Sequence, residues 1–174
     1  IESKLMTERT TKITFEGQEI ELPVVEGSEG EQAIDISKLR DQSGLISYDP
    51  GFANTGACQS SITFIDGEKG ILRYRGYPIE QLAENSSFLE VAWLLIYGEL
   101  PNKAELEEFT TAITYHTMLH ENLRGFFSAL PKNSHPMPVT AATVGALSTF
   151  YQEKETERSI RETTIRLIAK FPTI

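Results

Sequence analysis

The sequence predicts a mainly helical fold that is preceded by a small antiparallel, β-rich N-terminal segment. Up to about residue 76, apolar and polar residues alternate with a period of two, as in half-buried strands. After that point the apolar residues recur with a period of 3.6, and the starts and stops are those of helices. With 174 residues, 40% of them hydrophobic and 24% charged, the chain can bury a sizeable core and is not expected to be disordered.

A hairpin is expected near the N-terminus. Residues 11–15 and 19–24 alternate on either side of a turn at residues 16–18. Pro23 lacks a backbone N–H, so we expect its strand to lie at a sheet edge or to end there.

Two further β elements are expected before the helices. A strand over residues 45–48 should stop at the Asp-Pro-Gly of residues 49–51. Residues 61–65 and 71–74 flank a Gly-containing loop and predict a second hairpin with a longer connection.

Helix caps mark the second part of the chain. Ser87 and Glu90 predict a capping box for a helix that ends at Gly98, and Asn102 with Glu105 starts the next helix. The first of these helices is apolar nearly all round and should therefore be covered on all sides. Further helices are expected over residues 123–130, from 136 and from about 157.

We expect three parts along the chain. Residues 1–10 are interpreted as an added or disordered start, because Met6 lies inside them. Residues 11–76 form the β-rich segment, and residues 77–174 form the helical part. Several helices carry more apolar surface than they can bury among themselves, and the chain stops at Ile174 directly after one of them, so we interpret it as a truncated piece of a larger fold.

Charge and cysteine content exclude several classes of partner. The net charge of −9 repels the phosphate backbone, so no nucleic-acid partner is expected. No apolar run approaches the roughly 20 residues of a membrane span, so no membrane partner is expected either. The single cysteine, Cys58, cannot form an internal disulfide; we expect a small buried residue in a cytoplasmic protein.

His116 and His120 have the i, i+4 spacing with which two imidazoles on one helix can bind a metal ion. The zinc-protease motif needs a Glu after the first His, and Thr117 stands there instead. The alternative is that the helix ends near Leu119 and that the histidines cap or pack against neighbours. We favour this alternative and predict no metal site.

A group of cations near the C-terminus offers a second candidate. Arg166 and Lys170 lie one helical turn apart and could hold a phosphate, with Tyr151 of the preceding helix beside them. The alternative is an ordinary surface ion pair, because Glu162, Arg166 and Lys170 follow each other at i, i+4 and i+8. From the residues alone we favour the ion pair.

A long series of ordered matches then identifies a family. The segments that carry the resemblance are Asp-Pro-Gly-Phe at residues 49–52, Ser-Ile-Thr-Phe-Ile-Asp-Gly at 61–67, Gly-Ile-Leu-Arg-Tyr-Arg-Gly-Tyr-Pro-Ile-Glu-Gln-Leu at 70–82, Gly-Glu-Leu-Pro at 98–101, His-Thr-Met at 116–118, Ser-His-Pro-Met at 134–137 and Lys-Phe-Pro-Thr at 170–173. Together they resemble the N-terminal portion of citrate synthase, in the form common in Gram-negative bacteria.

The resemblance implies an acyltransferase of the tricarboxylic acid cycle. The family condenses acetyl-CoA with oxaloacetate and water to citrate and free CoA, requires no cofactor, and is cytoplasmic, mostly helical and a dimer or hexamer. The catalytic Asp and His residues of the family have no counterpart in this chain, because they come later in the family sequence. The resemblance therefore implies no catalytic residue here and an inactive fragment. It also implies that residues 77–174 are the first helices of the large domain, and that those of about residues 103–130 lie at the dimer interface.

In the Gram-negative form, NADH is an allosteric inhibitor at a site away from the catalytic residues. Positions of this chain that match the NADH-contacting ones are Tyr151, Arg166, Lys170, His116 and Thr117. Tyr115 stands where the NADH-sensitive pattern has an arginine.

Two alternatives stay open from the sequence. One is a fragment of 2-methylcitrate synthase, which uses propionyl-CoA. The other is a non-catalytic helical module that binds a nucleotide at the cation group or a metal at the two histidines.

Overall fold

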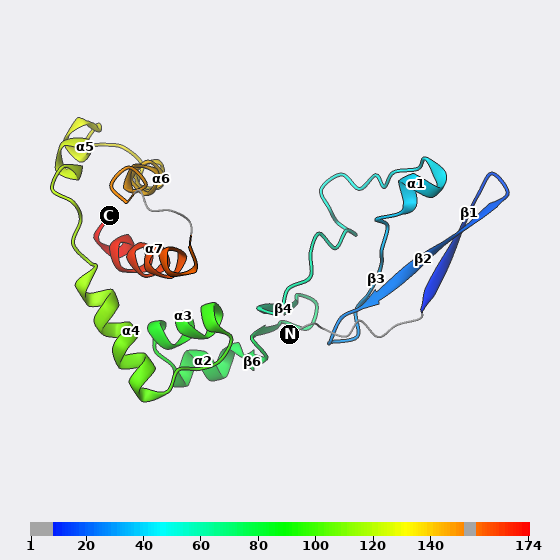
Figure 1. Cartoon of the computed structure of the whole chain (residues 1–174), viewed down its shortest axis with the longest axis horizontal. Helices are drawn as coiled ribbons and strands as arrows, with labels where there is room; N and C mark the ends of the chain where they lie inside the picture. The colour runs from blue at the N-terminus through cyan, green and yellow to red at the C-terminus, as the bar shows by residue number, and fades with distance from the viewer. Residues whose placement is uncertain (1–8, 152–155) are drawn as a thin grey trace. The chain divides into compact units, whose positions relative to one another are not determined.

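The chain divides into two units, Ile1–Ser60 and Ser61–Ile174. The computed structural model describes residues 9–151 and 156–174. Of the start expected over residues 1–10, residues 1–8 lie outside this range. Within the described residues there are seven α-helices and two three-stranded sheets, with the strands early in the chain and most helices later (Figure 1). The predicted mainly helical fold with a β-rich start is confirmed.

The first unit is built on an antiparallel sheet in the order β1-β2-β3. Its strands are β1 (Thr10–Phe15), β2 (Gln18–Glu26) and β3 (Gln32–Ile34), and α1 (Leu39–Ser43) follows. The predicted hairpin is confirmed, with Glu16 and Gly17 at positive φ in its turn. Ile20 and Leu22 are buried beneath Leu39 of α1, which makes a small core on one face of this sheet.

Pro23 does not place β2 at an edge, and that expectation is wrong: β2 is the central strand. Pro23 lies where β2 changes partner. Pro23 pairs with Thr10 of β1, and the next residue of β2, Val24, pairs with Ile34 of β3. Its carbonyl accepts from Asp35 N (2.8 Å), just beyond the end of β3. In an extended strand the N–H and C=O of one residue point to the same side, so the missing N–H of Pro23 would face the end of β3, and the pairing of β2 with β1 is kept.

Residues 45–48 form no strand, contrary to prediction. Leu45 packs against the small core, whereas Ile46 and Tyr48 are 71% and 89% exposed. The apolar alternation is present, but no neighbouring strand pairs with it, and an unpaired segment gains no ladder hydrogen bonds.

The second unit begins with the predicted second hairpin, which is confirmed. Strands β4 (Thr63–Asp66) and β5 (Ile71–Tyr74) pair antiparallel, and the short β6 (Tyr77–Pro78) joins β5. Arg75 and Gly76, both at positive φ, turn the chain between β5 and β6.

The helices of the second unit follow directly. They are α2 (Ile79–Asn85), α3 (Phe88–Tyr97), α4 (Lys103–Tyr115), α5 (Leu123–Ala129), α6 (Pro136–Leu147) and α7 (Glu157–Lys170), which the 3₁₀ turn η1 (Phe171–Thr173) extends. The predicted capping box of α3 and the predicted N-cap Asn102 of α4 are confirmed, and Asn102 forms a capping box with Glu105 as well. Gly98 ends α3 in the left-handed conformation. Within the described residues, no helix combines the length and apolarity needed to cross a membrane.

Helix α3 is not covered on all sides, so that expectation is wrong within this chain. Leu94 is fully buried, but Phe88 at the start of the helix is 75% exposed. The Trp93 ring meets Phe109 of α4 edge-on at 5.4 Å. Helix α4 thus covers one side of α3 and leaves other apolar residues in solvent.

The last helix also buries a different face from its most apolar one. Ile165, Ala169 and Lys170 are buried, whereas Ile160 and Phe171 are 60% and 57% exposed. The face of α7 that packs on α4 carries both apolar and polar side chains. Lys170 on this face therefore meets the end of α4. This packing creates the candidate site.

Candidate functional site

The predicted cation group comes together where α7 packs on the end of α4. The Arg166 guanidinium carbon lies 4.8 Å from the centre of the Tyr151 ring, and the Lys170 ammonium lies 5.6 Å from the same centre. Two cations at these distances are both attracted to the ring face. Residues far apart in the sequence therefore form one cluster, which we call the Tyr151 cluster: Tyr151, Arg166, Lys170, His116 and Thr117.

Lys170 does not take part in a surface ion pair, and in this respect the favoured interpretation is wrong. The residue is 3% exposed. Its Nζ donates to the backbone carbonyl oxygens of His116 (2.7 Å) and Met118. The buried ammonium is thus satisfied by carbonyl groups at the end of α4, where the helix dipole also favours positive charge.

Arg166 does form the predicted ion pair with Glu162, at 3.4 Å. Glu162 also accepts a hydrogen bond from Arg158 Nε at 2.9 Å. This hydrogen bond, with smaller contributions from the positive charges of Arg158, Arg166 and His116, lowers the pKa of Glu162 despite its partial desolvation. An ionised carboxylate outside the cluster, that of Glu162, therefore lies next to Arg166.

His116 and Thr117 join the cluster through their backbone. The Thr117 carbonyl accepts from Thr173 Oγ1 at 3.1 Å. Thr117 Oγ1 in turn donates to the Thr114 carbonyl at 3.0 Å, within the last turn of α4. Sequence reasoning missed the contributions of Thr173 and of the Met118 carbonyl, because a backbone oxygen carries no residue signature.

The cluster combines two cations with one aromatic ring. Arg166 presents a planar guanidinium beside an aromatic ring, which suits a phosphate and a base. The Arg166 side chain is 16% exposed, so its reach into solvent is small. Lys170 directs its ammonium group to backbone carbonyls.

The two histidines do not share a helix. Helix α4 ends at Tyr115 with His116 as its C-cap, earlier than the expected end near Leu119. His120 Nδ1 accepts from Asn122 N at 3.2 Å, and its ring lies 4.6 Å from that of Phe150. The capping and packing contacts agree with the favoured interpretation, whereas its helix end near Leu119 is wrong. Among residues 9–151 and 156–174, no three His, Cys, Asp or Glu side chains gather to hold a metal.

Cys58 is exposed and free, so the expectation of a buried residue is wrong. It lies in the irregular segment between α1 and β4, where no neighbouring strand or helix covers it.

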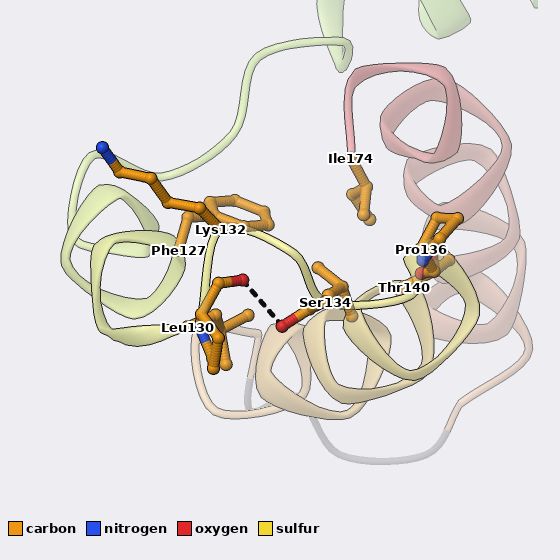
Figure 2. Close-up of a pocket in the computed structure, with 9 residues that line it drawn as sticks. Phe127, Leu130, Lys132, Ser134, Pro136, Thr140 and Ile174 are labelled. Atoms are coloured by element: carbon orange, nitrogen blue, oxygen red, sulfur yellow. Dashed lines mark hydrogen bonds between the residues drawn. The ribbon is translucent and has the colours of Figure 1, made fainter.

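Two pockets of the second unit are lined by residues between 118 and 140 and by Ile174. One, of about 300 Å³, has mostly apolar walls from α5, the α5–α6 connection, α6 and Ile174, and Figure 2 shows Lys132 pointing away from it. Ser134 Oγ closes the loop at its rim by donating to Pro131 O at 2.7 Å (Figure 2). The other, of about 400 Å³, is lined by residues 118–121, Leu123, Arg124 and Phe127. Neither pocket is lined by Tyr151, Arg166 or Lys170.

Comparison with known proteins gives a consistent result. The family model described as "Citrate synthase, C-terminal domain" matches residues 51–174. Citrate synthase 1 of Mycobacterium tuberculosis, from strains CDC 1551 / Oshkosh and ATCC 25618 / H37Rv, is 51% identical over 171 residues. This match covers 97% of the chain and 40% of the relative, so the chain spans about 40% of the length of the curated relatives it matches.

Solved structures agree with these matches. Citrate synthase from Thermotoga maritima has a TM-score of 0.61 and 38% identity, covering 71% of this chain and 32% of that one. The enzyme from Pyrobaculum aerophilum has a TM-score of 0.63 and 28% identity over 95% of this chain and 39% of that one. A ternary complex of Thermoplasma acidophilum citrate synthase with carboxymethyl coenzyme A and oxaloacetate has a TM-score of 0.66 and 25% identity, covering 71% and 33%.

Proposed function

The chain belongs to the citrate synthase family, and from this premise we propose that it is part of an enzyme that condenses acetyl-CoA with oxaloacetate and water to give citrate and free CoA. The observation that carries the proposal is the 51% identity over 171 residues with Citrate synthase 1 of M. tuberculosis. The solved relative in complex with carboxymethyl coenzyme A and oxaloacetate supports the substrate pair.

The chain alone is proposed to be inactive. It spans 40% of the length of that relative, and the resemblance carries no catalytic acid or base onto its residues. Condensation needs a base for the methyl proton and donors for the developing oxyanion. We therefore assign these roles to parts of the enzyme that the chain does not contain.

A chimera tests the proposed function. The 171 matching residues of M. tuberculosis Citrate synthase 1 are replaced by this chain, and CoA release is measured with acetyl-CoA and oxaloacetate. We expect release by the chimera and none by the 174-residue chain alone. The unaltered relative is the positive control. A chimera that folds as the relative does but releases no CoA overturns the proposal.

The two alternatives predict different results in the same assay. A 2-methylcitrate synthase would favour propionyl-CoA, and a non-catalytic module would contribute nothing to a chimera. The relatives compared with this chain are named citrate synthases, which supports neither alternative.

We also propose that the Tyr151 cluster is an allosteric NADH site of the whole enzyme. The proximity of Arg166 to the Tyr151 ring, at 4.8 Å, supports it, because this pair can receive a phosphate and stack a base. Tyr115 is 81% exposed next to the cluster, at the position where the resemblance would have an arginine. An arginine there would add a bidentate phosphate contact.

Assembly and compartment complete the proposal. We propose a cytoplasmic homo-oligomer, a dimer or hexamer, acting in the tricarboxylic acid cycle. The exposed apolar side chains on α3 and α7 support self-association. The exposed, unpaired Cys58 supports a reducing compartment.

A further inference from the structure

Three consecutive backbone carbonyls after α4 are bound by side chains from the other end of the unit. The carbonyl oxygens of His116 and Met118 accept from Lys170 Nζ. The carbonyl oxygen of Thr117, between them, accepts from Thr173 Oγ1 at 3.1 Å. Lys170 and Thr173 lie three residues apart, at the end of α7 and in η1, so one short segment supplies all three bonds.

These bonds reach carbonyl groups just beyond the end of α4. Helix α4 ends at Tyr115, and the last carbonyls of a helix have no intrahelical donors. Residues 116–122 connect α4 to α5 without regular structure. The carbonyls of His120 and Glu121 are bonded locally by the first N–H groups of α5, whereas those of residues 116–118 accept side-chain donors from outside the connection. Lys170 of α7 donates the hydrogen bonds to His116 and Met118, and so joins the connection to a helix more than 50 residues later in the sequence.

Burial makes the Lys170 bonds costly to break. The residue is 3% exposed, so opening the connection would leave the ammonium without partners in a dry environment. Its positive charge is favoured there by the C-terminal end of α4 and by the Tyr151 ring, 5.6 Å away. Within the described residues, Lys170 makes no ion pair with a carboxylate that could hold it elsewhere.

We propose that Lys170 and Thr173 form a backbone clamp, a conformational device that fixes the connection between α4 and α5 against the end of α7. The connection supplies Met118, Leu119 and His120 to the wall of the pocket of about 400 Å³. The clamp therefore sets the shape of that wall and couples it to the position of α7. The clamp rests on hydrogen bonds within this chain and does not depend on the proposed enzyme reaction.

Limited proteolysis of the purified chain tests the clamp. Chymotrypsin can cut after Tyr115, which is 81% exposed at the start of the connection, but only when the connection opens into an extended form. Cleavage after Tyr48, 89% exposed in the first unit, serves as the internal reference. The measured quantity is the ratio of the two cleavage rates, from the masses of the products.

Lys170→Met keeps the side-chain length but removes every donor. We expect the ratio to rise about tenfold or more, as for loss of charged hydrogen bonds. Lys170→Arg, which keeps donors, should restore most of the protection. Lys132→Met, on an exposed lysine away from the connection, should leave the ratio unchanged. A folded Lys170→Met chain with an unchanged ratio overturns the clamp.

Thr173→Val decides the question if Lys170→Met does not fold. It removes one hydrogen bond from an exposed residue and leaves α7 intact. We expect the ratio to rise about two- to tenfold, as for loss of a single neutral hydrogen bond. An unchanged ratio in this variant also overturns the clamp.

Discussion

Arg75 Nη2 donates a hydrogen bond to the backbone carbonyl of Leu95 at 2.9 Å, and so joins the turn after β5 to the last turn of α3. Nη1 of the same guanidinium donates to Ser61 Oγ at 3.0 Å. Arg75 adopts a positive φ of 49°, so the turn itself directs the side chain. A single residue thus connects the small sheet of the second unit to its first long helix.

Replacing Arg75 by alanine should weaken this connection. Arg75→Ala removes a charged donor from a helix C-terminal carbonyl, and we expect the free energy of unfolding to fall by about 1–3 kcal/mol. Urea unfolding followed by circular dichroism measures it. Arg124→Ala is the matched control, because that side chain is 85% exposed in its ion pair and its loss should change stability by less than about 0.5 kcal/mol. Equal effects of both variants would contradict the assignment.

The N-cap of α4 should contribute measurably to stability. The Asn102 side chain accepts from the N–H groups of Ala104 (2.9 Å) and Glu105 (3.0 Å). Asn102→Ala leaves these donors without their partner and should cost about 1 kcal/mol in thermal or urea unfolding. Asn122 caps α5 without any side-chain hydrogen bond, so Asn122→Ala should cost little. A larger loss for Asn122 than for Asn102 would refute the role of the side chain.

Stability should depend on pH through Glu90. The Ser87 backbone N–H donates to Glu90 Oε2 at 2.6 Å and lowers the pKa of Glu90 from its ordinary value of 4.5. A carboxyl whose pKa is lowered on folding stabilises the fold above its unfolded pKa, and this contribution is lost as the pH falls through the folded pKa.

Glu90→Gln mimics the protonated form and isolates this effect. Wild type should be more stable than the variant above about pH 5, and the difference should vanish in strongly acidic solution. Unfolding curves between pH 2 and 7 measure it. A difference that stays constant over the whole range would show that ionisation of Glu90 is not involved.

Local signals predicted much of the fold, because the chemistry of a cap or turn lies within a few residues. Ser87, Asn102 and Gly98 mark helix ends in the sequence and in the structure alike. Pro23 was misleading because it stands where β2 changes partner, so its missing N–H faces the end of β3 and the pairing with β1 is kept. Residues 45–48 misled because a strand needs a neighbour, and alternation alone does not supply one.

The candidate site was predictable as a set but not as an arrangement. Spacing and resemblance brought Arg166, Lys170 and Tyr151 together, and the structure has them in contact. The same spacing suggested that Lys170 points to solvent, since helical periodicity does not say which face packs. Its true partners are carbonyl oxygens, which every residue possesses and no sequence pattern marks.

NADH binding should depend on Arg166 and improve with an arginine at residue 115. Titration followed by NADH fluorescence should show saturable binding to the chain, weakened at least about tenfold by Arg166→Ala, because the charged phosphate contact is lost. Tyr115→Arg should tighten binding by a similar factor through a new bidentate contact.

Arg124→Ala, on an exposed arginine of α5, is the control for general loss of positive charge and should leave NADH binding unchanged. If Tyr115→Arg shows no saturation at any NADH concentration tested, the proposed NADH site is wrong. Equal weakening by Arg166→Ala and Arg124→Ala would instead indicate non-specific attraction of the dinucleotide.

The purified chain should associate with itself through apolar side chains left exposed near the end of α4. Met118 is 78% exposed and lies within residues 103–130, which the resemblance puts at a subunit interface. We expect the average mass from light scattering to rise with protein concentration, and Met118→Glu to reduce that rise, because a charge is costly to bury without a partner. Ile46→Glu, at a 71% exposed position in the first unit, should have no such effect. A strictly monomeric chain at every concentration would contradict the proposed interface, and equal effects of the two variants would mean that the association is unspecific.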